Sequence, residues 1–326
     1  MALKITPEYI NFLNRAVEHE IKVSIQYILQ HGKMEKLIKK VLPENVLLAQ
    51  TTYDAVGKVL RDFAIQEMKH TADIMERIYY LGGQATTKAG TPQIGNSISE
   101  FAKNGVQAEE EALTLYREII QTAGQIGDWK TREMFEKIYR VEEEHLFKLQ
   151  EYTGFQDEKE ELNRVSLPEW RKIYTDDYFA LLNKAIAAEI TGIIQYINQH
   201  EKQAFLELRT KDTPLETVKN TNKTKVVSDI LKGIFMQEMD HLEKISERIY
   251  LLEGEAVYTP DPLPIVGNNA DDFMHLDHKL ESDTILLYRQ IIAEALKRQD
   301  TTTKCMFEDI IIQEEEHFWT FDDFVK

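Results

Sequence analysis

Glu142-Glu143-Glu144-His145, three acids followed by a histidine, returns 172 residues later as Glu314-Glu315-Glu316-His317. Around each run, large apolar residues recur at spacings of three and four, which is the period of one face of an α-helix. In each run the first acid and the histidine share that apolar face. The sequence therefore predicts a helix in each half that turns a carboxylate and an imidazole toward a hydrophobic interior.

The rest of the chain repeats in the same way. Leu13-Asn14-Arg15-Ala16 returns as Leu182-Asn183-Lys184-Ala185, and Glu76-Arg77-Ile78-Tyr79 returns as Glu247-Arg248-Ile249-Tyr250. The distance between partners changes only from 169 residues for the first pair to 172 for the acidic runs. Unrelated helices would not keep this register, so the 326 residues form a duplicated domain of ordinary size.

Each half contains four long stretches of helical periodicity, and strand-like alternation is absent. The predicted helices are 6–32, 52–82, 97–124 and 128–153, then 175–208, 223–253, 269–298 and 301–324. Loops are expected at about 32–51 and 201–224. Long connections at about 84–97 and 255–269 join the second and third helices, as a bundle with one crossover requires.

These patterns predict an all-α chain of two tandem four-helix bundles. We expect domain 1 at 1–156, a linker at 157–173 and domain 2 at 174–326. The linker is acidic and polar, and its segment Glu158 to Val165 is expected to form a short extra helix.

All eight predicted helices carry a carboxylate on the apolar face, and four of them add a histidine three residues later. The inward-facing residues are Glu20, Glu67, His70, Glu109, Glu142 and His145, then Glu189, Glu238, His241, Glu281, Glu314 and His317. Burying an unpaired carboxylate costs several kcal/mol, and no Lys or Arg lies on these faces. Two divalent cations in each bundle would balance its four carboxylates.

The ligand types narrow the choice of metal. Imidazole with carboxylate suits iron or manganese, and the single cysteine, Cys305, excludes an internal disulfide and a thiolate cluster. Six ligands shared by two ions leave coordination positions open for oxygen. A lone Glu-x-x-His pair is commonly surface decoration, but four pairs on apolar faces with four matching glutamates are not.

Charge and hydropathy exclude other classes of protein. The net charge of −17 argues against nucleic-acid binding, which needs clustered cations. No apolar run approaches the roughly 20 residues of a membrane span, and the first residues lack the apolar stretch of a secretory signal. The expected location is the cytoplasm.

Both halves resemble a bacterioferritin over nearly their whole length. The motifs are Leu-Asn-Arg-Ala-Val-Glu-His-Glu ending at Glu20, Glu67-Met68-Lys69-His70, Glu109 eight residues before Arg117, and the run ending at His145. The resemblance implies two ferritin-like bundles that oxidise iron(II) with oxygen or peroxide and store the product. It implies that Glu67 and Glu142 bridge two irons, with Glu20 and His70 holding one and Glu109 and His145 the other.

The second half carries the same implied roles. Glu238 and Glu314 would bridge, with Glu189 and His241, and Glu281 and His317, completing the pair. Tyr27 and Tyr196 match a family tyrosine that can donate an electron, although core packing explains a buried tyrosine equally well. Met68 and Met239 match the haem-ligating methionine, although methionine also fills gaps between helices.

Departures from the family pattern leave alternatives open. Gln66 and Gln237 stand where some relatives carry an acidic iron ligand, which favours oxidation over storage. The second half ends just after its fourth helix, without the family's short fifth helix. A homo-oligomer is expected, and whether it closes into a cage is left open. A di-iron oxidase or peroxide scavenger without storage is the main alternative, and a purely structural scaffold is another.

Overall fold

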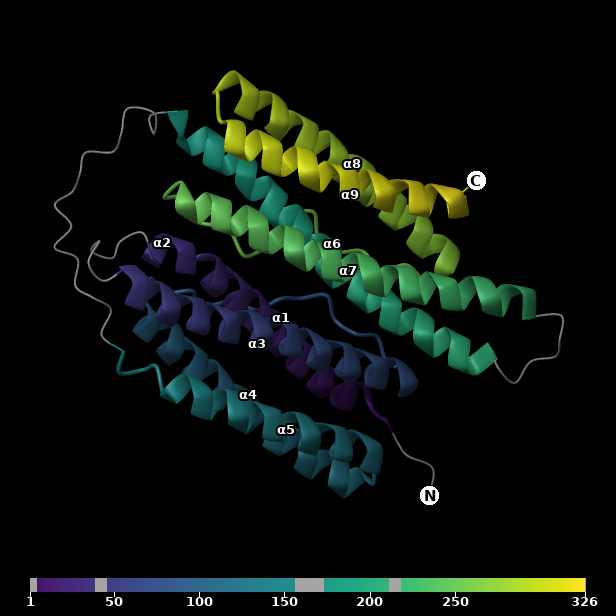
Figure 1. Ribbon diagram of the computed structural model, residues 1–326. Helices are drawn as coiled ribbons and strands as arrows, with labels where there is room; N and C mark the ends of the chain where they lie inside the picture. The colour runs from purple at the N-terminus through teal and green to yellow at the C-terminus, as the bar shows by residue number, and fades with distance from the viewer. Residues whose placement is uncertain (1–4, 39–45, 156–172, 211–217, 326) are drawn as a thin grey trace. The chain divides into compact units, whose positions relative to one another are not determined.

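The computed structural model describes residues 5–38, 46–155, 173–210 and 218–325, and its regular structure there is helical throughout. The chain divides into two compact units, Met1–Glu161 and Leu162–Lys326 (Figure 1). None of the described helices combines the length and apolarity that a membrane span requires. The fold is thus two tandem four-helix bundles, as the repeat predicts.

The first unit pairs its long helices as two hairpins. Its helices are α1 (Pro7–Gly32), the short α2 (Met34–Ile38), α3 (Val46–Tyr80), α4 (Ile98–Ile126) and α5 (Trp129–Gln150). α1 packs along α3 and α4 packs along α5, while α1 against α4 and α3 against α5 close the bundle.

The long connection between α3 and α4 is held along α1 by side chains of that helix. Asn14 binds the backbone of Gln84 and Thr86 near one end of the connection. Near the other end, Gln30 Nε2 donates to the carbonyls of Gln93 and Ile94. The crossover therefore covers α1 over much of its length and leaves the two hairpins facing one another.

The second unit repeats this architecture. Its helices are α6 (Asp176–Thr210), α7 (Val218–Leu251), α8 (Ala270–Lys297) and α9 (Thr301–Val325). α6 packs along α7, and α8 packs along α9. Asn183 and Gln195 of α6 bind the connection between α7 and α8, as Asn14 and Gln26 of α1 do in the first unit.

A buried aspartate begins the last helix of each unit. Asp128 caps α5 by accepting from Thr131 N at 3.2 Å, and it also pairs with Arg77 of α3 at 2.5 Å. Asp300 does the same with Thr303 and Arg248 at the start of α9. Because an N-cap aspartate satisfies free backbone N–H groups, this ion pair fixes where the last helix starts relative to the second.

Two predicted loops are wrong over much of their length. The stretch 32–51 contains α2 and the first turn of α3, while 201–224 contains the last turns of α6 and the first turns of α7. No glycine or proline interrupts 201–210 or 218–224, and α6 and α7 extend through these stretches. The predicted short helix at Glu158 to Val165 lies outside the described residues, and the linker boundaries stay a prediction.

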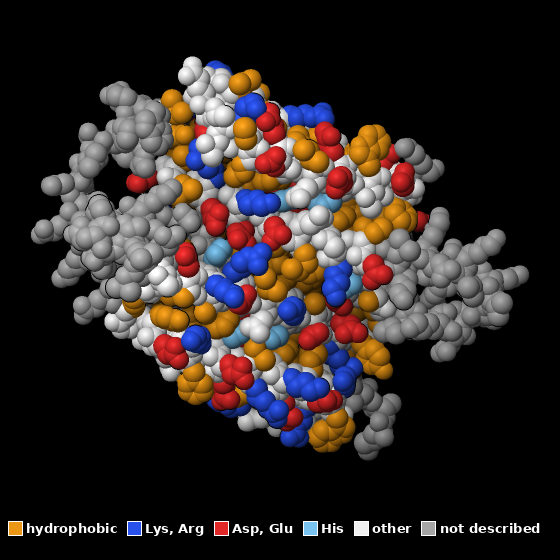
Figure 2. Space-filling view, in the orientation of Figure 1, with side chains coloured by type: hydrophobic (Ala, Val, Ile, Leu, Met, Phe, Trp, Pro, Cys, Tyr) orange, Lys and Arg blue, Asp and Glu red, His pale blue; other side chains and the backbone are white. Residues whose placement is uncertain are grey.

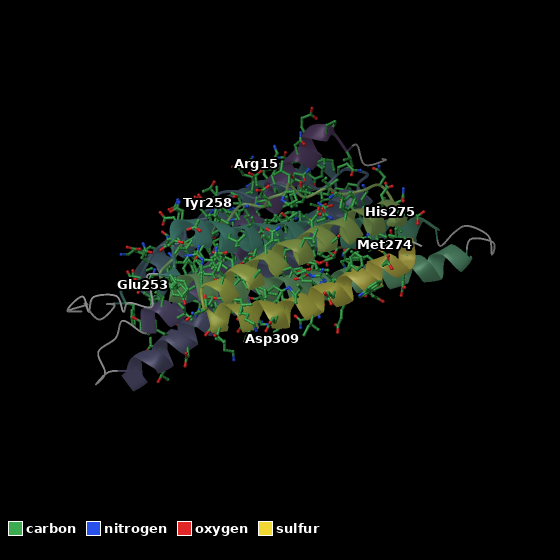
Figure 3. All side chains as sticks on the ribbon, turned by 90° about the horizontal axis from the view of Figure 1, so that it is seen from above. Arg15, Glu253, Tyr258, Met274, His275 and Asp309 are labelled. Atoms are coloured by element: carbon green, nitrogen blue, oxygen red, sulfur yellow. The ribbon has the colours of Figure 1, made fainter. Side chains whose placement is uncertain are left out.

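Acidic and basic side chains are interspersed on the face shown in Figure 2. Exposed residues such as Arg15 of α1 and Asp309 of α9 lie on the outer sides of their helices (Figure 3). The charged groups that matter for function are instead buried in the middle of each bundle.

Candidate metal centres

Six buried side chains converge in the first unit from its four long helices. Glu20 comes from α1, Glu67 and His70 from α3, Glu109 from α4, and Glu142 and His145 from α5. The relative exposure is 8% for His70 and 1–2% for the other five side chains. Each helix contributes its carboxylate from a position that otherwise faces the apolar core, so the fold brings together all six residues that the stripes predict.

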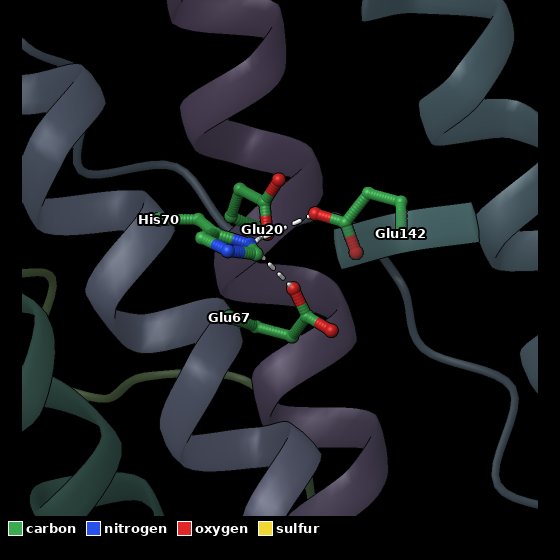
Figure 4. Close-up of side chains that lie close together, drawn as sticks. All are labelled: Glu20, Glu67, His70 and Glu142. Atoms are coloured by element: carbon green, nitrogen blue, oxygen red, sulfur yellow. Dashed lines mark hydrogen bonds and ion pairs between the residues drawn. The ribbon is translucent and has the colours of Figure 1, made fainter. Parts of the chain in front are cut away.

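Two carboxylates each divide their oxygens between the two imidazoles. The Nδ1 atom of His70 lies 3.1 Å from Glu67 Oε2 and 2.8 Å from Glu142 Oε1 (Figure 4). The Nδ1 atom of His145 lies 2.9 Å from Glu67 Oε1 and 3.1 Å from Glu142 Oε2. Glu67 and Glu142 therefore stand between two positions, each of which faces one imidazole.

The remaining two carboxylates lie on opposite sides of this pair. Glu20 groups with His70 and the two shared carboxylates, with Glu20 Oε2 3.7 Å from His70 Nδ1. Glu109 groups with His145 and the same two carboxylates. Each group can offer three carboxylate oxygens and one nitrogen to a metal ion, all within 4.8 Å of one another.

The second unit has the same arrangement. His241 Nδ1 lies 3.1 Å from Glu238 Oε2 and 2.9 Å from Glu314 Oε1. His317 Nδ1 lies 3.4 Å from Glu238 Oε1 and 3.5 Å from Glu314 Oε2. Glu189 joins the His241 group and Glu281 joins the His317 group, so the two units present two matching clusters.

Several buried oxygen and nitrogen atoms of these clusters that could ligate a metal lack a hydrogen-bond partner among the described residues. They are Glu67 Oε1, both Glu142 oxygens, His145 Nδ1, Glu189 Oε2, both Glu314 oxygens and His317 Nδ1. Their short separations do not have hydrogen-bond angles, and unsatisfied buried polar atoms are costly. Oxygen and imidazole donors converging in this way suit a pair of divalent transition-metal ions.

Without metal, charge in the first cluster is balanced by protons. Burial alone would lower the pKa of both imidazoles, but contacts with Glu142 and Glu67 raise the pKa of His145 to about 10, and Glu142, Glu20 and Glu67 raise the pKa of His70 further. Burial would raise the pKa of Glu67, but His145 and His70 hold it well below its ordinary value.

The outer carboxylates behave in the opposite way. Burial, together with the Glu142 and Glu67 charges, raises the pKa of Glu20 well above its ordinary value. Burial and the same two charges do this to the pKa of Glu109. The metal-free cluster therefore holds two imidazolium groups and two protonated carboxyl groups, all of which must release a proton before they can act as ligands.

A tyrosine donates to each outer carboxylate. Tyr27 donates its hydroxyl hydrogen to Glu109, and Tyr116 donates to Glu20. In the second unit, Tyr196 donates to Glu281 and Tyr288 donates to Glu189. The sequence singled out only Tyr27 and Tyr196. Periodicity makes Tyr116 and Tyr288 look like core aromatics, although a buried tyrosine hydroxyl normally needs an acceptor.

Glutamines hold three of the four imidazoles from behind. His145 Nε2 lies 2.7 Å from Gln66 Oε1, and His317 Nε2 lies 2.7 Å from Gln237 Oε1. His241 Nε2 lies 2.6 Å from Gln313 Oε1, where the first unit has Val141. Because the amide oxygen accepts from Nε2–H, the proton that each of these imidazolium groups releases is the one on Nδ1, which then presents its lone pair to the cluster. The sequence did not indicate this role for any glutamine.

Met68 and Met239 are buried, with exposures of 3% and 4%. Each follows a shared glutamate on its helix, so its side chain leaves the helix in a different direction from the cluster. Their role in binding haem stays a prediction.

A buried acid distinguishes the second unit near its cluster. Asp277 is fully buried on α8, one turn before Glu281, and accepts from Gln195 Nε2 at 2.8 Å. The first unit has Gly105 at the corresponding position. Burial raises the pKa of Asp277 to about 8.

We expect Asp277→Asn to stabilise the metal-free protein more at pH 8 than at pH 5. The folded state holds the Asp277 proton up to about pH 8, whereas an unfolded aspartate releases it near pH 3.9. Stability therefore falls as pH rises between these values, and asparagine removes that slope. Calorimetry should show a gain of roughly 8 °C at pH 8 and much less at pH 5. Exposed Asp309→Asn serves as the control, and an equal gain at both pH values would contradict this assignment.

Comparison with known proteins agrees with this geometry. The ferritin-like domain model matches residues 10–155 and 219–326. The chain belongs to the ferritin-like family. The second match begins in α7, yet α6 carries Glu189 at the position that repeats Glu20 of α1. The ferritin-like architecture therefore extends over both units.

Relatives named bacterioferritin align with less than half of the chain, as expected when one chain holds two copies of a domain. The bacterioferritin of Desulfovibrio desulfuricans is 28% identical over 138 residues, which cover 42% of this chain and 69% of the relative. That of Mycobacterium tuberculosis is 29% identical over 141 residues, covering 43% and 79%. That of Rhodobacter capsulatus is 29% identical over 145 residues, covering 44% and 81%.

Proposed function

We propose that each unit is a di-iron ferroxidase centre that binds two iron(II) ions, its substrate, and oxidises them. The proposal is carried by the geometry of the shared carboxylates. Each of them directs one oxygen toward one imidazole of its cluster and the other oxygen toward the second imidazole, as seen for Glu67 and Glu142 and for Glu238 and Glu314. That geometry suits ligands shared by two cations. The four carboxylates of each bundle balance two divalent charges, and manganese would find the same donors.

The chain's own groups have distinct tasks in this function. The shared carboxylates fix the two cation positions, and the outer carboxylates complete them. Tyr27 and Tyr116 orient the outer carboxylates of the first unit by donating to them. Burial and the Glu109 charge raise the pKa of Tyr27 well above its ordinary value, so its phenol keeps its proton and remains a donor to Glu109. The role of Tyr27 and Tyr196 as electron donors stays a prediction.

The redox step balances with an oxidant of the dioxygen or peroxide class. Two iron(II) ions lose one electron each and become iron(III). Hydrogen peroxide takes both electrons and two protons, its O–O bond breaks and two waters form. Dioxygen takes the same electrons and protons to form hydrogen peroxide.

The fate of the product distinguishes iron storage from a non-storage oxidase or peroxide scavenger. Gln66 and Gln237 stand where some relatives carry an acidic ligand, and both amides are engaged with imidazoles of the clusters. This observation favours oxidation over storage. Particle size after iron loading separates the two, since a storage shell would retain hundreds of irons per particle. Assembly as a homo-oligomer, the cytoplasmic location and haem binding stay predictions.

The experiment that tests the function is aerobic addition of iron(II) to the purified chain. A ferric absorption should rise quickly until about four irons per chain are oxidised, two at each centre. Oxidation no faster than in buffer would contradict the proposal. Repeating the addition with hydrogen peroxide in place of oxygen identifies the oxidant.

A further inference from the structure

The two centres differ in how a cation can approach them between the first and third helices of each bundle. In the second unit, a cavity of about 10 Å³ lies between α6 and α8. It touches the carboxylate residues Glu189, Glu238, Glu281 and Glu314, and the small residues Ala188 and Gly192. A cavity of this size accommodates about one water-sized species.

Gly192 keeps this cavity open. A Cβ atom there would lie 3.3 Å from the Tyr196 ring, 3.5 Å from Glu238 Cγ and 3.7 Å from Glu238 Cδ. A larger side chain would therefore fill the space beside that carboxylate. The corresponding residue of the first unit is Val23, which is 1% exposed.

His19 occupies the second critical position in the first unit, where the second unit has Ala188. Its ring meets the Tyr116 ring edge-on with centroids 6.5 Å apart, and Tyr116 donates to Glu20 of the centre. His19 Nε2 is buried and has no hydrogen-bond partner among the described residues. One aromatic ring, that of Tyr116, thus lies between the His19 imidazole and Glu20 of the first centre, and the imidazole carries a ligand atom without a hydrogen-bond partner among the described residues.

Outside His19 lies a surface groove of about 710 Å³ between α1 and α4. It is lined by His19 and by four acids, Glu18, Glu110, Glu111 and Glu118. Arg15, labelled in Figure 3, and Lys22 are its cationic residues, and Lys22 is paired with Glu111 at 3.0 Å. The excess of carboxylates attracts divalent cations to the groove that His19 lines.

We propose that the two centres take up divalent cations by unequal routes: directly through the Gly192 cavity in the second unit, and past His19, a plug and transient ligand, in the first. The proposal rests on the proposed function, because both require the clusters to bind divalent cations. It predicts that the second centre fills faster than the first.

Cobalt(II), which oxygen does not readily oxidise at such sites, tests the routes by its visible absorption after rapid mixing with the metal-free full chain. The native protein should bind in two phases of similar amplitude. Gly192→Val should slow the fast phase by at least ~10-fold, and His19→Ala should speed the slow phase by at least ~10-fold. Gly233→Val and His275→Ala make the same changes at exposed positions and should leave both phases unchanged.

Equilibrium titration with cobalt(II) distinguishes a failure of the unequal routes from a failure of the proposed function. Unchanged cobalt stoichiometry in the variants, with altered rates, supports unequal routes. One phase in the native protein, or rates that neither variant changes, would overturn them while leaving the centres intact. If Gly192→Val lost cobalt altogether, Ala188→His would replace it, and an unchanged fast phase there would also overturn the inference. Absence of cobalt binding by the native chain would contradict the proposed function itself.

Discussion

Replacing Glu142 and Glu314 together by glutamine is expected to abolish rapid iron(II) oxidation. Each carboxylate directs two oxygens toward two imidazoles, with Glu142 Oε1 2.8 Å from His70 and Oε2 3.1 Å from His145. Glutamine keeps the shape but has one oxygen, and its NH₂ group would face the second cation. Loss of residues that merely orient ligands costs 10–100-fold, so loss of a shared ligand should lower the rate by at least roughly 100-fold.

The duplication gives this experiment an internal standard. Glu142→Gln alone should remove the first centre and halve the iron oxidised in the fast phase, and Glu314→Gln alone should remove the second centre with the same loss. Exposed Glu144→Gln and Glu316→Gln make the same change two residues after each shared glutamate, on the outer face of the helix, and should leave the amplitude unchanged. Full amplitude in the double variant would contradict the assignment of these glutamates.

The cluster residues could be recognised in the sequence because burying an unpaired carboxylate costs several kcal/mol and therefore needs an explanation. A glutamate on an apolar helical face has few explanations, and eight such glutamates with four histidines, repeated in two halves, have fewer. The periodicity also placed each acid on its correct helix. What it could not supply was the pairing of particular oxygens with particular nitrogens, since that depends on rotamers and on how deeply the helices interlock.

The residues behind the clusters were harder to recognise. Tyr116 lies seven residues after Glu109 and so shares its face, but periodicity alone makes it a core aromatic. Its bond to Glu20, on another helix, appears only in three dimensions. Gln313 is a similar case, because no local pattern indicates that an amide will reach His241 across the bundle.

The sequence shows which residues differ between the two halves, but it does not show where these residues lie relative to the clusters. Aligning the repeats pairs His19 with Ala188 and Gly105 with Asp277. Only the fold shows that Ala188 lines a cavity at the second centre, that His19 lines a surface groove, and that Asp277 is fully buried. The predicted end of α6 at 208 lies two residues before its last residue, Thr210, whereas α7 begins at Val218, five residues before the predicted start at 223. No glycine or proline between 218 and 223 marks that start in the sequence.

Metal binding is expected to raise the melting temperature of the chain, and more strongly at pH 8 than at pH 6. A ligand at 1,000 times its dissociation constant stabilises the folded state by about 4 kcal/mol, which corresponds to roughly 8 °C or more for units of this size. Calorimetry of the metal-free protein, before and after addition of zinc(II) or manganese(II), measures this melting temperature. The Glu142→Gln and Glu314→Gln double variant is the control that should lose the shift.

The pH dependence follows from the protons that a metal must displace. Nearby carboxylates raise the pKa of His145 to about 10 and that of His317 to about 9, against the tendency of burial, so both imidazoles are protonated at neutral pH without metal. Protons and cations therefore compete for the same Nδ1 atoms, and raising the pH favours the cation. At each centre, binding should release about four protons, two from imidazoles and two from the outer carboxyl groups.

The metal-free protein should show the opposite trend. A histidine whose pKa is higher in the folded state stabilises that state below its unfolded pKa of about 6.5, and this contribution is lost as pH rises through the folded value. The melting temperature without metal should thus fall between about pH 6.5 and 10, while the shift caused by metal grows. Proton release measured in weakly buffered solution checks the same linkage. A metal-induced shift that is equal at pH 6 and pH 8, with no protons released, would mean that the cation binds somewhere other than these buried clusters.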